Sequence, residues 1–300
     1  MYYQGDDFIG YQHIQHFVPK FEPFNSHIAF MIISAARVAT QNKKYDYGHK
    51  FNRDEMNATI ISLPVTSSGD IDFAFMDSFI RELEEARILE LADYLKVSGL
   101  ADSKLSARER KALDRFEAID WKGFRYDEIF NHIEQGRRLK KDDQIAGDIP
   151  FVMSGITNTG VVNHISNPVA SFPANSITVD IFGNVFYRSF AYGLGDDTGA
   201  YWNDKKHYSK DNMLFFAASM ARSLVGRFSY GHKLRSSQSL GFKMHLPVLA
   251  SGMPDYGYME TLMRAVQKLV VKDVVDFAVK RISATKKCVR SGGMKRGTGQ

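Results

Sequence analysis

Four basic side chains stand close together in the stretch GRRLKK at residues 136–141. Arg137, Arg138, Lys140 and Lys141 could neutralise the phosphates of a polyanion, and the release of bound counterions would then drive binding. The alternative is a solvated run on an ordinary protein surface. The stretch is therefore a candidate phosphate-binding segment, and the rest of the chain must decide between the two interpretations.

A second candidate is a tetrapeptide that occurs twice. Tyr-Gly-His-Lys stands at residues 47–50 and again at 230–233, and a Leu-Pro-Val follows each time. A short turn there would project His49 and Lys50, with Arg53 close behind, or His232 and Lys233 in the second case. Alternatively, Tyr230 and Gly231 build a tight turn and Tyr230 packs in the core.

Motifs for catalysis are missing from the sequence. SNPVA at 166–170 lacks the second proline and the aromatic residue that an adenine methyltransferase needs, so we interpret it as a turn. There is no G-x-x-x-x-G-K-[ST] phosphate loop, and the histidines and Cys288 lack metal-ligand spacing. The acidic stretch RELEEARILELADYL indicates a solvated or partner-binding face. We expect a binding protein without a cofactor, not an enzyme.

The charge of the chain is divided unevenly. Residues 1–150 contain 20 Lys and Arg against 25 Asp and Glu, a net charge of −5, whereas residues 151–300 contain 19 against 9, a net charge of +10. A basic half suits a polyanion-binding surface. About half of that excess comes from the tail TKKCVRSGGMKRGTGQ, so charge alone leaves the question open.

Composition sets broad limits on the class of protein. The chain has 300 residues and 44% hydrophobic residues, enough for one large core or two moderate ones. Its single cysteine excludes an internal disulfide. The N-terminus lacks the pattern of a signal peptide, and no stretch reaches the roughly 20 apolar residues of a membrane span. We expect a cytoplasmic protein that does not bind membranes.

The tetrapeptide belongs to an internal repeat. An offset of 183 residues holds without a gap for some fifty residues and matches Leu63 to Leu246, Gly69 to Gly252 and Met76 to Met259. Two copies of one unit follow. The second copy extends back to Trp121, whereas the first begins at Tyr2, the counterpart of Phe186. We therefore expect the first copy to be truncated at its N-terminal side or to survive as a partial scaffold.

The complete copy predicts mixed secondary structure. Short apolar segments between turn residues predict strands over 121–165, and NSITVDIFGNVFYRSF predicts a hairpin hinged at Phe-Gly-Asn. NMLFFAASMARSL predicts a helix, and GFKMHLPVL predicts a strand. After each Leu-Pro-Val comes a helix of about 24 residues, ~36 Å long, with an apolar stripe at helical spacing. The matched stripes suggest that the two helices pack together, unless each docks on its own domain.

These motifs in this order resemble a known family. WKGFRYDEIF, then GDIPFVMSGITNTGVV, NSITVDIFGNVFY, Phe-Ser-Tyr-Gly and Leu-Pro-Val with its helix, are similar to the target-recognition domain of restriction-modification specificity subunits. The resemblance covers Trp121 to Ile282 fully and, in the first copy, Tyr2 to about Leu100. LPVLASGMPDYGYME is closer to type IIB and related systems than to the average type I subunit.

The resemblance implies an α+β fold, in which β-rich target-recognition domains are joined by long helices that pair as an antiparallel coiled coil. Each domain would read one half of a split sequence in double-stranded DNA, and the helices would act as a ruler. The subunit itself would not be catalytic. A partner adenine methyltransferase and a nuclease subunit would perform the chemistry.

The expected organisation has five segments. They are a partial first target-recognition domain (1–70), a first spacer helix region (71–118), a complete second target-recognition domain (119–252), a second spacer helix (253–284) and a basic flexible tail (285–300). Two further functions stay open. The chain could be a truncated orphan that mainly binds the partner, or the C-terminal specificity part of a fused methyltransferase-nuclease.

If the chain reads DNA, further contacts can be predicted. We expect residues 188–210 to form the variable reading loop, through Arg188, Lys205, Lys206 and His207. Asn158 and Asn163 could read adenine edges bidentately, although asparagine more often builds turns.

Overall fold

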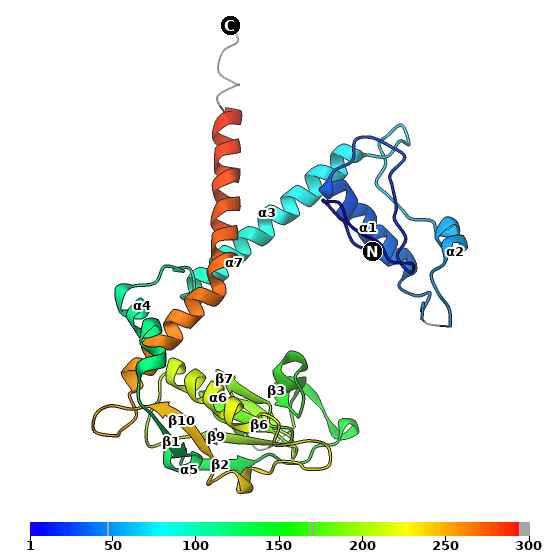
Figure 1. Ribbon diagram of the computed structural model, residues 1–300. Helices are drawn as coiled ribbons and strands as arrows, with labels where there is room; N and C mark the ends of the chain where they lie inside the picture. Colours follow the sequence, from blue (N-terminus) through cyan, green and yellow to red (C-terminus); the bar gives the residue numbers. More distant parts are fainter. Residues whose placement is uncertain (47, 168, 170, 294–300) are drawn as a thin grey trace. The chain divides into compact units, whose positions relative to one another are not determined.

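The computed structural model describes residues 1–46, 48–167, 169 and 171–293, with side chains up to residue 283 (Figure 1). Helices and strands are both present, which confirms the α+β class. The chain divides into two compact units. Residues 1–101 and the chain from residue 273 onward form the first unit, and residues 102–272 form the second. No helix in the described part of the chain has the length and apolarity to cross a bilayer.

Antiparallel and parallel pairings build three sheets in the second unit. Strands β1 (Trp121–Arg125) and β10 (Lys243–Pro247) pair antiparallel, so that segments about 120 residues apart in the sequence lie side by side. One four-stranded sheet has the order β2-β9-β6-β7 and consists of β2 (His132–Gln135), β9 (Thr198–Trp202), β6 (Ser176–Asp180) and β7 (Val185–Arg188). The other has the order β4-β3-β8-β5 and consists of β4 (Val161–Ile165), β3 (Ala146–Val152), β8 (Tyr192–Leu194) and β5 (Ser171–Phe172).

The predicted hairpin at Phe-Gly-Asn is confirmed as β6 and β7. Asp180 starts its turn, and its Oδ1 accepts hydrogen bonds from the backbone N–H of Phe182 and of Asn184, both at 2.9 Å. Gly183 has a φ of +84°, which glycine adopts without the steric cost of a Cβ. Asp180 and Gly183 thus determine the turn between β6 and β7.

The predicted helix after residue 209 is confirmed as α6 (Lys210–Leu224). The Ser209 side chain caps it by accepting a hydrogen bond from Asn212 N at 3.3 Å. Its buried face, which includes Met213, Phe216 and Met220, packs on β10, β7 and β6 and forms the main core of the unit. The strand expected in GFKMHLPVL is also confirmed, as β10.

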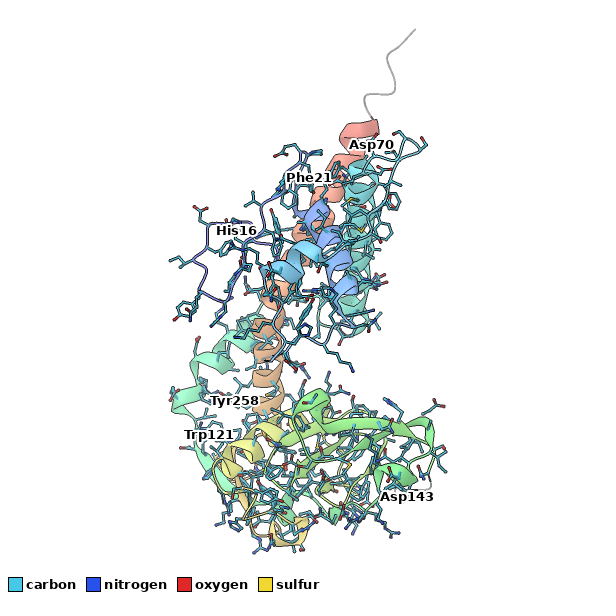
Figure 2. The ribbon with its side chains drawn as sticks, turned by 90° about the vertical axis from the view of Figure 1, so that its right-hand side faces the viewer. His16, Phe21, Asp70, Trp121, Asp143 and Tyr258 are labelled. Atoms are coloured by element: carbon cyan, nitrogen blue, oxygen red, sulfur yellow. The ribbon has the colours of Figure 1, made fainter. Side chains whose placement is uncertain are left out.

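Helix α7 (Tyr256–Gly293) begins inside the second unit, and its first turns are fixed there. The Tyr258 hydroxyl, labelled in Figure 2, donates to Ala112 O of α4 (Ala107–Asp114) at 2.8 Å. Lys268 Nζ lies 3.0 Å from Asp102 Oδ2 and 3.1 Å from the buried carboxylate of Glu109. A short helix α5 (Tyr126–Ile129) completes the α-helices of this unit within the described residues.

The described residues of the first unit contain helices and no named strand. They are α1 (Ser26–Thr40), α2 (Arg53–Ala58), α3 (Phe73–Val97) and the part of α7 from residue 273. Helix α1 packs on α3 through buried side chains such as Ile28 and Met76. His27 lies between two carboxylates of α3, with its Nδ1 2.8 Å from Asp77 and its Nε2 3.6 Å from Glu84.

The long helices differ from the prediction in length and in burial. Helix α3 has 25 residues, close to the expected 24, but α7 has 38 residues and continues through 285–293 of the predicted flexible tail. The backbone can continue because residues 258–291 contain neither proline nor glycine. Residues 294–300 of that tail lie outside the described residues.

The predicted pairing of the two long helices remains a prediction. Arg281 of α7 lies 3.9 Å from Glu84 of α3, a distance that permits a weak ion pair. Side chains expected in the seam, such as Leu83 and Val270, are 43% and 74% exposed. The first residue of the predicted apolar stripe is Met76 in α3 and Met259 in α7. Each of them is fully buried in its own unit.

The structure confirms the repeat at the turn that follows Leu-Pro-Val. Isolated bridges join Val65 to Ile71 and Val248 to Pro254. Both residues of the second bridge lie 183 positions after their counterparts in the first. Gly69 and Gly252 have φ values of +90° and +78° within these turns. Helices α1 and α6, which precede the turns, both have 15 residues.

Candidate nucleic-acid interface

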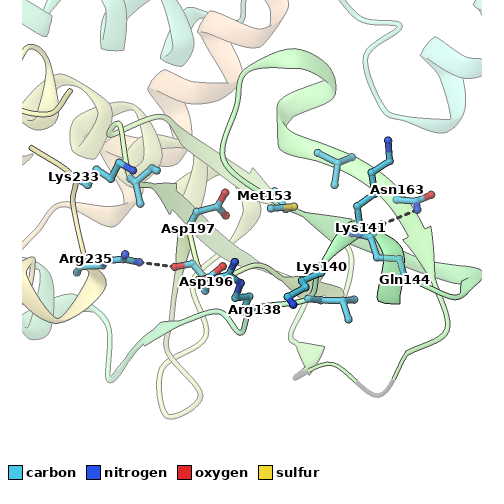
Figure 3. Close-up of a pocket in the computed structure, with 13 residues that line it drawn as sticks. Arg138, Lys140, Lys141, Gln144, Met153, Asn163, Asp196, Asp197, Lys233 and Arg235 are labelled. Atoms are coloured by element: carbon cyan, nitrogen blue, oxygen red, sulfur yellow. Dashed lines mark hydrogen bonds between the residues drawn. The ribbon is translucent and has the colours of Figure 1, made fainter. Parts of the chain in front are cut away.

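Basic side chains from two distant segments meet around one hollow of the second unit. The hollow has a volume of about 740 Å³ (Figure 3). Five cationic residues line it, namely Arg138, Lys140, Lys141, Lys233 and Arg235. The structure thus brings the GRRLKK run together with the end of the second Tyr-Gly-His-Lys and the residues after it.

Backbone hydrogen bonds to β8 and β9 hold the start of the GRRLKK run in place. The run follows strand β2. Gly136 N donates to Thr198 O and Arg137 N donates to Leu194 O, both at 2.9 Å. A Cβ on residue 136 would lie 2.1 Å from Gly195 O, so only glycine allows this approach.

All four cations of the run are exposed, and none of them forms an ion pair with a carboxylate in the described part of the chain. They are Arg137, Arg138, Lys140 and Lys141. Arg138, Lys140 and Lys141 face the hollow, while Arg137 does not line it. Cations that lack an intramolecular partner keep their charge available for a ligand.

The second Tyr-Gly-His-Lys forms a tight turn, closed by reciprocal backbone hydrogen bonds between Ser229 and His232. Tyr230 is 83% exposed, so the interpretation that it packs in the core is wrong. Its ring instead lies 4.6 Å from Lys233 Nζ, a cation–π contact. His232 is exposed, and its ring centroid lies 5.5 Å from that of Phe228.

Arg235 belongs to the hollow but was not predicted from the sequence. Its Nη1 donates to Asp196 O at 2.7 Å, which fixes the guanidinium on the wall of the hollow. Leu234 is buried and its N–H donates to Ile181 O, so Lys233 and Arg235 lie on the opposite, outer side of an extended segment. The alternation Lys-Leu-Arg was the signal that could have revealed Arg235.

The two predicted asparagines have different surroundings. Asn163 lies on β4 and lines the hollow, where its Nδ2 donates to Gln144 Oε1 at 2.9 Å. Asn158 has a φ of +46°, and its Nδ2 donates to Val161 O at 3.2 Å. The Asn158 amide therefore helps to build a turn, and only Asn163 stands in the hollow.

Residues 188–210 are not the loop that the sequence predicted. The segment contains β8 and β9, whose side chains are mostly buried. Arg188 is 1% exposed and binds Thr178 and Thr159, so it cannot reach a duplex without breaking those hydrogen bonds. Burial lowers the pKa of Arg188 to about 10, and the guanidinium stays charged at neutral pH.

The other predicted contacts lie outside the residues that line the hollow. Lys205, Lys206 and His207 are exposed after β9, and Lys206 Nζ donates to the Tyr256 hydroxyl at 2.9 Å. In the first unit, three predicted residues are exposed, namely His49, Lys50 and Arg53. Tyr47 lies outside the described residues.

The chemistry of the hollow suits binding to a nucleic acid. Its cations can hold phosphates, while Asp196 and Asp197, which also line it, can accept hydrogen bonds from the amino groups of base edges. No group of three or more His, Cys, Asp or Glu suited to a metal ion occurs among the described residues.

Comparisons with known proteins find similarity to DNA specificity domains and subunits. The family model of the type I restriction modification DNA specificity domain matches residues 118–269, just over half of the chain. The specificity subunit S.BcgI of a type II restriction enzyme from Heyndrickxia coagulans is 25% identical over 257 residues, which cover 85% of this chain and 70% of that protein.

Two solved structures have similar chains. The S subunit of a type I restriction-modification system from M. genitalium has a TM-score of 0.45 at 13% identity, over 88% of this chain and 70% of that one. The HsdS subunit from Thermoanaerobacter tengcongensis has a TM-score of 0.35 at 10% identity, over 87% of this chain and 64% of that one.

Proposed function

Because the chain belongs to the family of type I restriction-modification DNA specificity domains, we propose that the hollow of its second unit binds double-stranded DNA and selects the sequence on which a partner enzyme acts. The observation that carries the proposal is the convergence of cations on this hollow. Arg138, Lys140 and Lys141 come from one segment and Lys233 and Arg235 from another, more than 90 residues away.

The cations would bind the phosphates and so position the duplex. Such contacts contribute affinity at any sequence, and the affinity falls as salt rises. The remaining polar groups of the hollow would read bases. Carboxylates repel phosphates, so Asp196 and Asp197 favour the amino groups of cytosine or adenine, while the Asn163 and Gln144 pair presents amide donors and acceptors.

We assign the chemistry to partner chains, an adenine methyltransferase and a nuclease, which would bring their own cofactors. The long helices support a docking role. Helix α3 exposes Phe79 and Leu83, and α7 exposes Val270 and Phe277, all by more than 40%. Exposed apolar side chains along a helix are typical of a surface that another protein covers.

A cellular experiment tests the proposal. Cells that express the full chain with a cognate methyltransferase should carry methylated adenine at one sequence motif in their genomic DNA. A variant with Lys233→Glu and Arg235→Glu should lose that methylation, because two repulsive charges replace two phosphate-binding cations. The matched control changes the exposed Arg222 of α6 to Glu, which does not line the hollow. Unchanged methylation in the hollow variant would contradict the proposal.

A further inference from the structure

The turn that joins β3 to β4 has an unusual backbone. Gly155, Asn158, Thr159 and Gly160 all have positive φ values, of +140°, +46°, +52° and +85°. A β-branched residue such as Thr159 rarely adopts that region. A Cβ on residue 160 would lie 2.6 Å from Met153 O, so glycine is required there. Conformations of this kind persist where the surrounding structure holds them in place.

Arg188 holds one side of this turn from the interior. Its Nη2 donates to Thr159 O at 2.6 Å, its Nη1 to Thr159 Oγ1 at 3.1 Å and its Nε to Thr178 Oγ1 at 3.0 Å. The guanidinium also lies 5.4 Å from the Phe186 ring centroid. No carboxylate of the described chain pairs with it, so its buried charge serves the turn.

Asp180 holds the other side. Its Oδ2 accepts hydrogen bonds from Gly155 N at 3.0 Å and from Ser154 Oγ at 3.2 Å, and the side chain is only 3% exposed. Asp180 ends β6 and Arg188 ends β7, so both anchors belong to one hairpin. Burying two charges is costly unless their hydrogen bonds are satisfied, and here those bonds are divided between the β6–β7 hairpin and the turn 154–160.

The tip of the turn is presented to solvent beside the hollow. Ile156 is 72% exposed, whereas the flanking Met153, Val162 and Asn163 line the hollow. Figure 3 shows Met153 and Asn163 on its wall. The turn thus exposes an apolar side chain at its tip, and residues that line the hollow flank it along the chain.

We propose that Arg188 and Asp180 are positioning residues that hold the turn 154–160 rigid, so that Ile156 contacts the methyl group of a thymine in the bound duplex. The thymine methyl is the apolar feature of a base edge in the major groove, and it suits an aliphatic side chain. This inference rests on the proposed DNA binding by the hollow. It adds a reading element and the residues that fix it.

Replacing each thymine by uracil removes one methyl group at a time and tests the contact directly. The full chain with its methyltransferase first selects a duplex from a random library, and each thymine of that duplex is then replaced in turn. At one position, affinity should fall roughly fourfold, the value of one buried methyl group. The Ile156→Ala variant should bind the thymine-containing duplex and the responsive uracil-containing duplex with equal affinity. The Ile156→Val variant should keep the preference for thymine. Val225→Ala, at an exposed valine that does not line the hollow, is the control.

Arg188→Lys keeps the charge but removes the planar fork. This variant should lower the ratio of specific to random-sequence affinity by roughly tenfold, which is within the loss of affinity that one mismatched base pair causes. Its affinity for random-sequence DNA should stay unchanged. If Arg188→Lys lowers only thermal stability, or if no thymine responds to the removal of its methyl, the inference is wrong. If Arg188→Lys does not fold, the uracil series and Ile156→Ala decide alone. A wild-type chain that selects no sequence would contradict the proposed function instead.

Discussion

Asp72 and Asp255 stand 183 positions apart, and each accepts a hydrogen bond from the backbone N–H three residues ahead. Asp72 Oδ1 lies 2.8 Å from Phe75 N, and Asp255 Oδ1 lies 2.9 Å from Tyr258 N. The N–H of each aspartate also donates to the proline of its Leu-Pro-Val, Pro64 at 3.0 Å and Pro247 at 2.8 Å. Both long helices therefore begin through one hydrogen-bonded turn that occurs in each copy of the repeat.

The cap of α7 should contribute measurably to stability. Asp255→Ala should lower the free energy of unfolding by about 1 kcal/mol, because Tyr258 N loses its acceptor at the helix start. Asp255→Asn keeps an acceptor oxygen and should retain most of that free energy. Urea unfolding of the three proteins measures the difference, and equal midpoints for Ala and wild type would refute the capping role.

Binding to all duplexes should weaken alike when the four cations of the GRRLKK run are changed to Ala, namely Arg137, Arg138, Lys140 and Lys141. The slope of log affinity against log salt should become shallower by about one for each phosphate that the variant no longer binds. Four cations in or next to α4, Arg108, Arg110, Lys111 and Arg115, provide a matched control, and three of them line a separate hollow. Fluorescence anisotropy at several salt concentrations measures both slopes. An unchanged slope would remove the GRRLKK run from the interface.

Stability should depend on the titration of His132. Its hydrogen bond to Asp204 at 2.9 Å, assisted by Glu134, raises the pKa of His132 above its ordinary value of about 6.5. The charged imidazole therefore stabilises the folded chain below the unfolded-state pKa, and this contribution is lost as pH rises through the folded-state pKa. His132→Gln should remove that part of the pH dependence between acidic and mildly alkaline buffers. Urea unfolding across this range tests it, and parallel curves for the two proteins would contradict it.

Deleting residues 72–98, which include α3, should abolish binding of the methyltransferase and leave the second unit folded. The reason is that α3 carries several exposed apolar side chains, including Phe75, Phe79 and Leu83. Affinity capture from cells that express both proteins measures the binding, and circular dichroism of the deletion variant checks its fold. Capture of the methyltransferase by the deleted chain would show that it docks elsewhere.

Local patterns in the sequence predicted elements well where the short-range chemistry decides the structure. The β6–β7 hairpin follows from Asp180 and Gly183, and α6 follows from the periodicity of Met213, Phe216 and Met220. The repeat predicted two equivalent helix starts. The length of α7 was underestimated, although the absence of proline and glycine between residues 258 and 291 permits a longer helix.

The candidate site was predicted only in part, because burial and long-range contacts decide the rest. Arg138, Lys140, Lys141 and Lys233, which the sequence indicated as possible DNA contacts, line one hollow, and Arg235 was missed. Arg188 looked like an exposed contact, since a strand end and a loop start have similar local sequences. Tyr230 looked like a core residue, since nothing in its neighbours shows that the turn projects into solvent.

The turn between β3 and β4 separates the residues that hold it from the residues it presents. Arg188 and Asp180 lie in the interior, whereas Ile156 lies outside. Over evolutionary time, a new target preference could arise by substitution of the exposed Ile156 alone, which leaves both anchors of the turn in place. We therefore expect relatives with different targets to diverge at residue 156 while they retain the two buried charges and Gly160.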